Sequence, residues 1–188
     1  MKRLTVILDN GHGKETPGKR SPQWKDGSQL FEWEYTRKLS VAIEERLKQL
    51  GYNAVRIVKE NTDISLSERA KRANEIAKKS PSILLSIHCN AGKGRGWEVW
   101  STEKKNNSDI LADCFCSEFN RIFPDKKLRG HKEKNWTVLA MTNCPCVLTE
   151  NFFMDTEDEC KWMLTDDGFN RIVELHVAAA IAYMKKLN

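Results

Sequence analysis

The sequence lacks several features that define special classes of protein. No apolar run approaches the ~18 residues of a membrane-spanning helix, so no membrane span is predicted. No linker, internal repeat or low-complexity segment divides the 188 residues, and we expect one domain over residues 1–188. The first residues, MKRLTVILDNGHG, hold a short apolar stretch without a small-residue cleavage site, so no signal peptide is predicted. We therefore expect a protein that is made in the cytoplasm.

Cysteine pairs with the C-x-x-C spacing of structural zinc sites are also missing. The six cysteines are Cys89, Cys114, Cys116, Cys144, Cys146 and Cys160. Two pairs have C-x-C spacing, which is uncommon for a zinc site. Without a secretion signal, we interpret all six as reduced thiols that act as small core residues.

A strong charge imbalance is absent, since the formal net charge is only +5. One basic cluster occupies residues 126–134, with Trp136 as the only nearby aromatic residue. We favour a solvated basic loop, with His131 in solvent, over a surface that attracts nucleic acid or an anionic cell wall. No nucleic-acid partner is expected.

Strand-like and helix-like stretches alternate along the chain. Strands are predicted at residues 3–9, 53–59, 82–88, 96–101, 138–141 and 146–150, and helices at 32–50, 63–79, 107–123 and 166–186. Residues 82–88 (SILLSIH) are almost continuously apolar, which is typical of a strand covered on both faces. The alternation predicts a three-layer α/β/α fold with a mostly parallel, twisted sheet flanked by helices.

The first loop contains Gly13, four residues and then Gly18-Lys19, which approaches a phosphate-binding P-loop. A P-loop needs Ser or Thr after the lysine to hold Mg²⁺, and Arg20 occupies that position. Turn-forming residues follow where a helix should begin. We reject the nucleotide-binding interpretation and interpret Lys19 as solvated.

Polar residues lie instead where three predicted strands end. His12 closely follows the first strand, His88 ends SILLSIH, and Glu150 ends the strand CVLTE. If these strands are parallel neighbours, their side chains meet at one sheet edge, where α/β proteins bind ligands. Glu32, at the start of the long helix, can project over the same edge and is favoured there by the helix dipole.

Two imidazoles and one carboxylate form a typical catalytic zinc set, and a second carboxylate can act as a base. Each residue alone is a weak signal. A histidine beside glycine is often a turn residue, and an acidic residue at a helix start is often only a dipole partner. Glu150 is more unusual, because burying its charge without a partner costs several kcal/mol.

Four motifs carry a family resemblance: D-x-GHG at residues 9–13, EWEYTR at 32–37, SIHCNA at 86–91 and VLTE at 147–150. Together they resemble the zinc-dependent N-acetylmuramoyl-L-alanine amidases of the amidase-3 family, found in autolysins and phage endolysins. The resemblance extends from Leu4 to the last helix and implies a phosphorylase/hydrolase-like α/β fold. It also implies hydrolysis of the amide between N-acetylmuramic acid and L-alanine in peptidoglycan.

Carried over by position, the resemblance implies that His12, Glu32 and His88 bind Zn²⁺ and that Glu150 is catalytic. Glu34 is an alternative ligand. We prefer Glu32 because Thr36 stands four residues after it, at a position where relatives often have Asn. The family commonly has a small residue where this chain has Cys89, which we interpret as a core residue. We expect a monomer that acts on peptidoglycan or muropeptides, after release from a cell or export by another route.

Alternatives remain open at several points. The chain could be a non-catalytic wall-binding module, or a zinc hydrolase of another amide. We interpret residues 21–29 as a wall of the substrate groove. The glycine-rich residues 92–96 are either another wall of that groove or a flexible turn. Trp97, Trp100 and Trp136 are interpreted as core aromatics, and His176 as structural.

Overall fold

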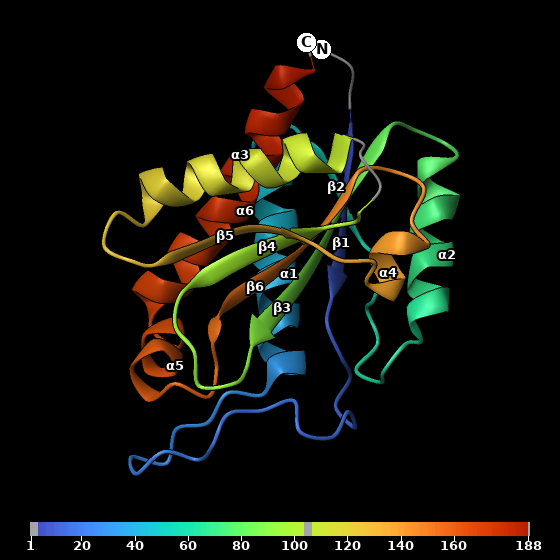
Figure 1. Ribbon diagram of the computed structural model, residues 1–188. Helices are drawn as coiled ribbons and strands as arrows, with labels where there is room; N and C mark the ends of the chain where they lie inside the picture. Colours follow the sequence, from blue (N-terminus) through green and yellow to red (C-terminus); the bar gives the residue numbers. More distant parts are fainter. Residues whose placement is uncertain (1–3, 104–106, 188) are drawn as a thin grey trace.

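A six-stranded mixed sheet forms the centre of the protein, in the strand order β2-β1-β3-β6-β4-β5 (Figure 1). The computed structural model describes residues 4–103 and 107–187. The strands are β1 (Thr5–Asn10), β2 (Asn53–Arg56), β3 (Ser82–Asn90), β4 (Trp97–Ser101), β5 (Leu128–Glu133) and β6 (Cys146–Phe153). The helices are α1 (Glu32–Gln49), α2 (Leu66–Ala77), α3 (Asn107–Ile122), α4 (Thr137–Ala140), α5 (Glu157–Met163) and α6 (Asp166–Lys186).

All strand pairs are parallel except β4 with β6. The predicted mostly parallel sheet is therefore confirmed. The predicted first strand began at Arg3, which lies outside the described residues. Because β1, β3 and β6 are parallel neighbours, their carboxyl ends lie at one edge, beside the loop that joins β1 to α1 (Figure 1).

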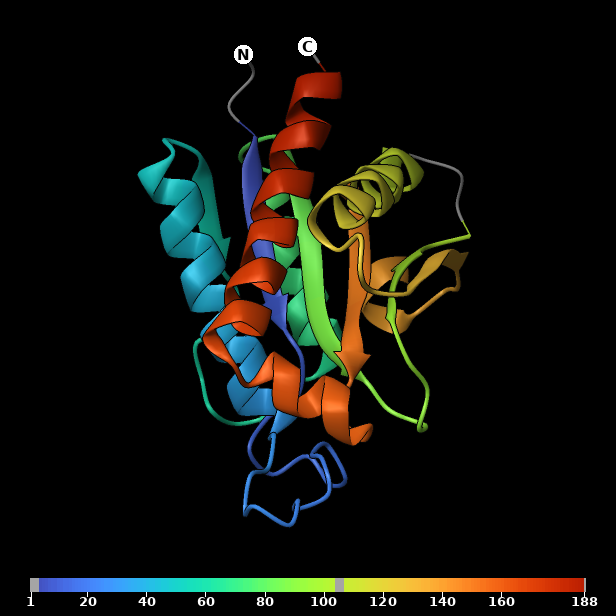
Figure 2. The same cartoon turned by 90° about the vertical axis from the view of Figure 1, so that its left-hand side faces the viewer.

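Helices cover both faces of the sheet, as the three-layer prediction requires. Alternate side chains of β1 enter two separate cores, because successive residues of a strand point to opposite faces. Val6 and Leu8 pack with α1, α3 and α6, whereas Ile7 packs with α2 and α4. Figure 2 shows α1, α6 and α3 side by side over the larger core.

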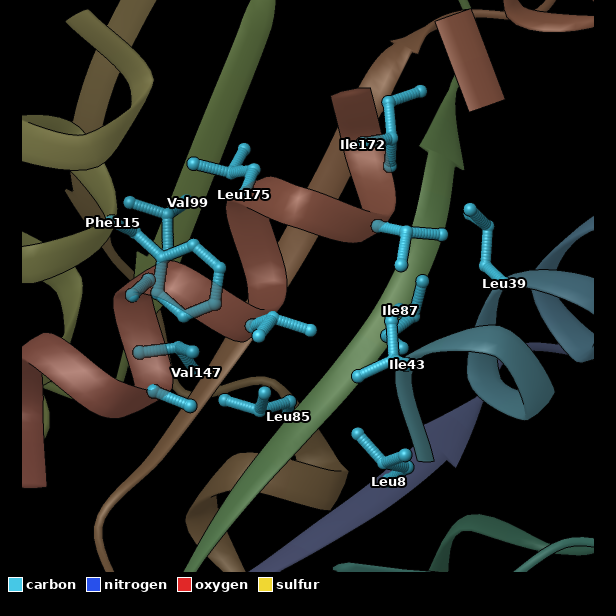
Figure 3. Packing of buried hydrophobic residues seen from close by; sticks show 14 of the residues in the cluster. Leu8, Leu39, Ile43, Leu85, Ile87, Val99, Phe115, Val147, Ile172 and Leu175 are labelled. Atoms are coloured by element: carbon cyan, nitrogen blue, oxygen red, sulfur yellow. The ribbon is translucent and has the colours of Figure 1, made fainter. Parts of the chain in front are cut away.

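The larger core holds the middle strands in place. Leu39 and Ile43 of α1 face Leu85 and Ile87 of β3, and Val147 of β6 lies nearby (Figure 3). All five side chains are fully buried. Fully burying an aliphatic side chain contributes about 1.5–3 kcal/mol, so this packing fixes the strands that carry the polar residues. Among the described residues, no helix is long and apolar enough to cross a membrane.

Helix starts follow local capping chemistry. The hydroxyl of Thr165 accepts a hydrogen bond of 3.1 Å from the Gly168 backbone N–H, which explains why α6 begins at the predicted residue. Ser65 caps α2 in the same way through the Glu68 N–H, at 3.3 Å. The helix predicted from residue 63 therefore begins three residues later.

Other predictions were wrong. Residues 138–141, predicted as a strand, fall largely within helix α4, because a short apolar run does not distinguish the two structures. Part of the basic cluster forms the edge strand β5 rather than a solvated loop. There, Ser101 Oγ lies 2.8 Å from the His131 ring, so His131 is not simply in solvent. Helix α5 was not predicted.

The structure agrees with the interpretation of the cysteines as free thiols and of His176 as a structural residue. All six cysteines are free, and all except the half-buried Cys116 are buried. His176 is fully buried, with its ring 2.9 Å from Thr149 Oγ1 and 2.8 Å from the Ile172 carbonyl, so it is structural. Trp97 is a core residue that stacks on Phe115.

Candidate metal centre

The carboxyl ends of three adjacent strands bring the predicted site residues together. His12 lies two residues beyond β1, and His88 on β3 is in direct register with Glu150 on β6. The strands continue to Asn90 and Phe153, so neither His88 nor Glu150 is the last residue of its strand.

Glu32, the first residue of α1, completes the cluster. One of its oxygens, Oε1, lies 3.4 Å from His12 Nε2 and 3.3 Å from His88 Nδ1. One candidate ligand atom from each of the three residues lies within 4.8 Å of the others. Glu34 is partly exposed and pairs with Lys38 at 2.7 Å, so the structure places Glu32 and not Glu34 beside the imidazoles.

The donor set fits a zinc ion. His12 Nε2 and Glu32 Oε2 are buried atoms without a hydrogen-bond partner among the described residues. Buried polar atoms are nearly always paired, and a cation bound between these residues would satisfy both atoms. Two nitrogen ligands and one oxygen ligand match catalytic zinc sites, which keep a further position open.

Burial and mutual contacts shift the pKa values of the three cluster residues. Burial would raise the pKa of Glu32, but its contacts with His12 and His88 outweigh burial and lower that pKa. Burial lowers the pKa of His12, which favours the neutral form that binds metal. Burial would also lower the pKa of His88, but contact with Glu32 raises it overall, so protons compete with metal there.

Glu150 lies outside the ligand cluster but beside it. Its Oε2 atom is buried and has no hydrogen-bond partner among the described residues. Burial raises the pKa of Glu150 to about 7, with the charges of Glu32 and Glu98 acting in the same direction and those of His88 and Lys19 against it. A carboxyl group with a pKa near neutrality is well suited to accept and return a proton.

Glu98, which sequence reasoning missed, lies opposite Glu150 on β4. Lys132 donates to its Oε2 atom at 2.6 Å, and Arg129 donates to the same oxygen. Burial would raise the pKa of Glu98, but these two cations outweigh burial and lower it. One of two facing carboxylates is therefore neutralised by cations, and only Glu150 is left free to titrate near neutral pH.

Two arginines, also missed, hold the His12 loop. His12 adopts a left-handed backbone conformation with φ of 61°. Its carbonyl accepts hydrogen bonds from Arg37 at 3.0 Å and from Arg69 at 3.3 Å. Arg69 is buried and pairs with Asp9 at 2.7 Å. Gly11 is required nearby, because a Cβ atom there would lie 2.4 Å from His88 Cε1.

A cavity of about 360 Å³ opens beside these groups. It is lined by His12, Lys19, Leu66, His88, Trp136, Thr137, Val138, Leu148 and Glu150. Its volume is within the range of small-ligand sites, about 300–1,000 Å³. Lys19 is half-buried and lines this cavity, and Trp136 lines it while also packing against the smaller core. Residues 21–29 and 92–96 are not among the lining residues described.

Comparisons with known proteins agree with this geometry. The family model described as N-acetylmuramoyl-L-alanine amidase matches residues 6–183. The endolysin of Bacillus phage SPP1 is 30% identical over 192 residues, covering 96% of this chain and 67% of that protein. The amidase CwlM of Bacillus licheniformis is 28% identical over 176 residues, covering 92% of this chain and 66% of that protein. The chain thus spans about two thirds of the length of both relatives.

Solved structures share the fold. An N-acetylmuramoyl-L-alanine amidase from Clostridium difficile 630 superposes with a TM-score of 0.88 at 27% identity, over 98% of both chains. The catalytic domain of CwlV from Bacillus (Paenibacillus) polymyxa has a TM-score of 0.83 at 22% identity, over 97% of this chain and 98% of its own. The second likeness supports the fold alone.

Proposed function

Since the chain belongs to the N-acetylmuramoyl-L-alanine amidase family, we propose that His12, Glu32 and His88 bind the Zn²⁺ with which it works and that Glu150 is its catalytic base. The family reaction is hydrolysis of the amide between N-acetylmuramic acid and the L-alanine of the peptidoglycan stem peptide. The observation that carries the assignment of roles is the largely buried His–Glu–His cluster, with two buried ligand atoms that have no hydrogen-bond partner among the described residues, beside Glu150, whose buried Oε2 atom also has none.

The residues divide the chemistry between them. When bound, Zn²⁺ supplies a Lewis acid that polarises the scissile carbonyl and makes a water molecule more acidic. Glu150 accepts the proton of the attacking water and returns it to the departing L-alanine nitrogen. Glu98 stays ionised against Lys132 and Arg129, so it does not compete for that proton. Arg37 and Arg69 hold the His12 backbone in its left-handed conformation.

The substrate is peptidoglycan of a bacterial cell wall, as polymer or as soluble muropeptides, and the protein acts on it as a monomer. A non-catalytic wall-binding module would not need a complete ligand cluster together with a free base. A zinc hydrolase of another amide would share the cluster, so the products must separate these two functions.

The test combines metal analysis with mass spectrometry. The purified protein should hold one Zn²⁺ per chain, lose activity in a chelator and regain it with added Zn²⁺. Digests of peptidoglycan should contain a free muramic lactyl carboxylate and a new L-alanine N-terminus. Cleavage at a different amide would reveal the other hydrolase, and stoichiometric zinc without turnover would favour the binding module.

A further inference from the structure

We propose that Lys19 determines substrate specificity by binding a carboxylate on the peptide side of the scissile amide. This inference rests on the amidase function proposed above and concerns the same cavity. Lys19 does not belong to the zinc cluster, and no role follows for it from the family motifs. Three observations support the proposal: Lys19 lines the cavity, it forms no ion pair with the described residues, and hydrogen bonds anchor its backbone.

The cavity has a simple division of chemistry. Leu66, Val138 and Leu148 give it an apolar wall, and the Trp136 indole extends that wall. His12 and His88 of the metal cluster and Glu150 also line the cavity. Among the described lining residues, Lys19 is the one permanent cation. A ligand that fills this cavity therefore meets apolar surface, the reacting groups and a single positive charge.

Among the described residues, Lys19 forms no ion pair with a carboxylate, although its charge lowers the pKa of Glu150. Lys132 and Lys161 differ in this respect, since their ammonium groups lie 2.6 Å from Glu98 and 2.8 Å from Asp26. The charge of Lys19 is thus available to a ligand, while it also acts on Glu150, which lines the same cavity.

The backbone holds Lys19 in a defined place relative to the metal cluster. Its carbonyl accepts a hydrogen bond of 3.0 Å from the Glu32 N–H, so lysine and metal ligand are joined directly. Arg20 and Phe31 form the next bridge, and the Ser21 N–H donates to the Leu30 carbonyl at 2.8 Å. A loop closed in this way loses little further entropy when Lys19 binds a ligand.

The chemistry of the substrate supplies a suitable anion. The glycan on one side of the scissile amide carries no charge, whereas the peptide on the other side carries carboxylates. With the amide at the zinc cluster and Glu150, a carboxylate one residue beyond L-alanine lies within a few bonds of the reacting atoms. A charge-assisted hydrogen bond from Lys19 would distinguish this carboxylate from its amidated form.

Two soluble substrates test the proposal. N-acetylmuramoyl-L-alanyl-D-isoglutamate has a free α-carboxylate, and the isoglutamine analogue has an amide at the same position. We expect the zinc-loaded protein to prefer the carboxylate form. Lys19→Gln should lower kcat/KM for that form about 10- to 100-fold, mainly through KM, and should change the value for the amide little. Lys19→Arg should restore much of the preference, and Lys14→Gln, an exposed lysine in the same loop, should have no effect.

Binding measurements keep the proposal separate from the proposed reaction. Calorimetry measures the affinity of both dipeptides for zinc-loaded Glu150→Gln protein, with and without Lys19→Gln. Because Glu150→Gln prevents turnover, the measurement reports binding alone. A selective loss of affinity for the carboxylate form supports the role of Lys19, even if the wild-type protein cleaves neither dipeptide and the proposed function fails. Equal effects of Lys19→Gln on both dipeptides, or no effect, would overturn the role while leaving the amidase assignment intact.

Discussion

Replacing Glu150 with glutamine should make the protein inactive and, at alkaline pH, more stable. The side chain keeps its shape but can no longer accept a proton. General base catalysis typically contributes 10²–10⁴-fold, so kcat on muropeptides should fall by about that factor. Zinc content should stay at one ion per chain, because the His12–Glu32–His88 cluster does not include Glu150.

The stability effect follows from burial. Burial raises the pKa of Glu150 to about 7, whereas the unfolded chain releases this proton near pH 4.3. Between these values the folded state binds more protons than the unfolded state, so stability falls as pH rises. The ionised Glu150 therefore costs up to about 4 kcal/mol above pH 7, and glutamine avoids this cost.

The assay is urea denaturation of metal-free wild-type and variant proteins at pH 5 and pH 8. Metal must be absent because a nearby cation would stabilise the ionised carboxylate and lower its pKa. The stability gained by Glu150→Gln should be larger at pH 8 than at pH 5, by up to about 3 kcal/mol. Glu34→Gln is the matched control: its exposed pair with Lys38 should matter by less than about 0.5 kcal/mol.

Two results would refute this reasoning. A zinc-loaded Glu150→Gln protein with more than about a tenth of the wild-type activity would show that another group is the base. A stability difference that does not grow between pH 5 and pH 8 would show that the buried carboxyl does not titrate in this range.

Three further predictions concern the groups around the metal. Arg69→Met should lower the free energy of unfolding by about 3–5 kcal/mol in urea, since it leaves Asp9 buried without its partner; a loss below about 1 kcal/mol would contradict the pairing. Zinc affinity, measured by competition with a chromophoric chelator from pH 8 to pH 5.5, should fall about tenfold per pH unit below the raised pKa of His88, and a pH-independent affinity would rule out this competition. Gly11→Ala should weaken zinc binding at least about tenfold, because its Cβ would lie 2.4 Å from His88 Cε1. Gly27→Ala, at a positive φ in open space, should cost about 1 kcal/mol of stability and keep zinc, so equal zinc affinities in the two variants would argue against the steric effect.

Local patterns were sufficient to find the residues at the strand ends. His88 and Glu150 lie at the ends of apolar runs, so their meeting at one edge could be predicted on the condition that the strands are parallel neighbours, and β3 and β6 meet that condition. Residues 138–141 failed for a related reason, because four apolar residues carry too little periodicity to separate helix from strand. The contacts of Arg69 with Asp9 and of Lys132 with Glu98 join residues 60 and 34 positions apart, and no local pattern indicates them.

The sequence by itself determined the alternation of strands and helices and the types of donor atom available at the sheet edge. Only the tertiary structure decided that Glu98 is neutralised by cations, that Glu150 is left unpaired and that Lys19 enters the cavity. The physical reason is that a side chain's pKa and free charge depend on burial and on neighbours in space. Strand order and helix packing set those neighbours, and distance along the chain does not.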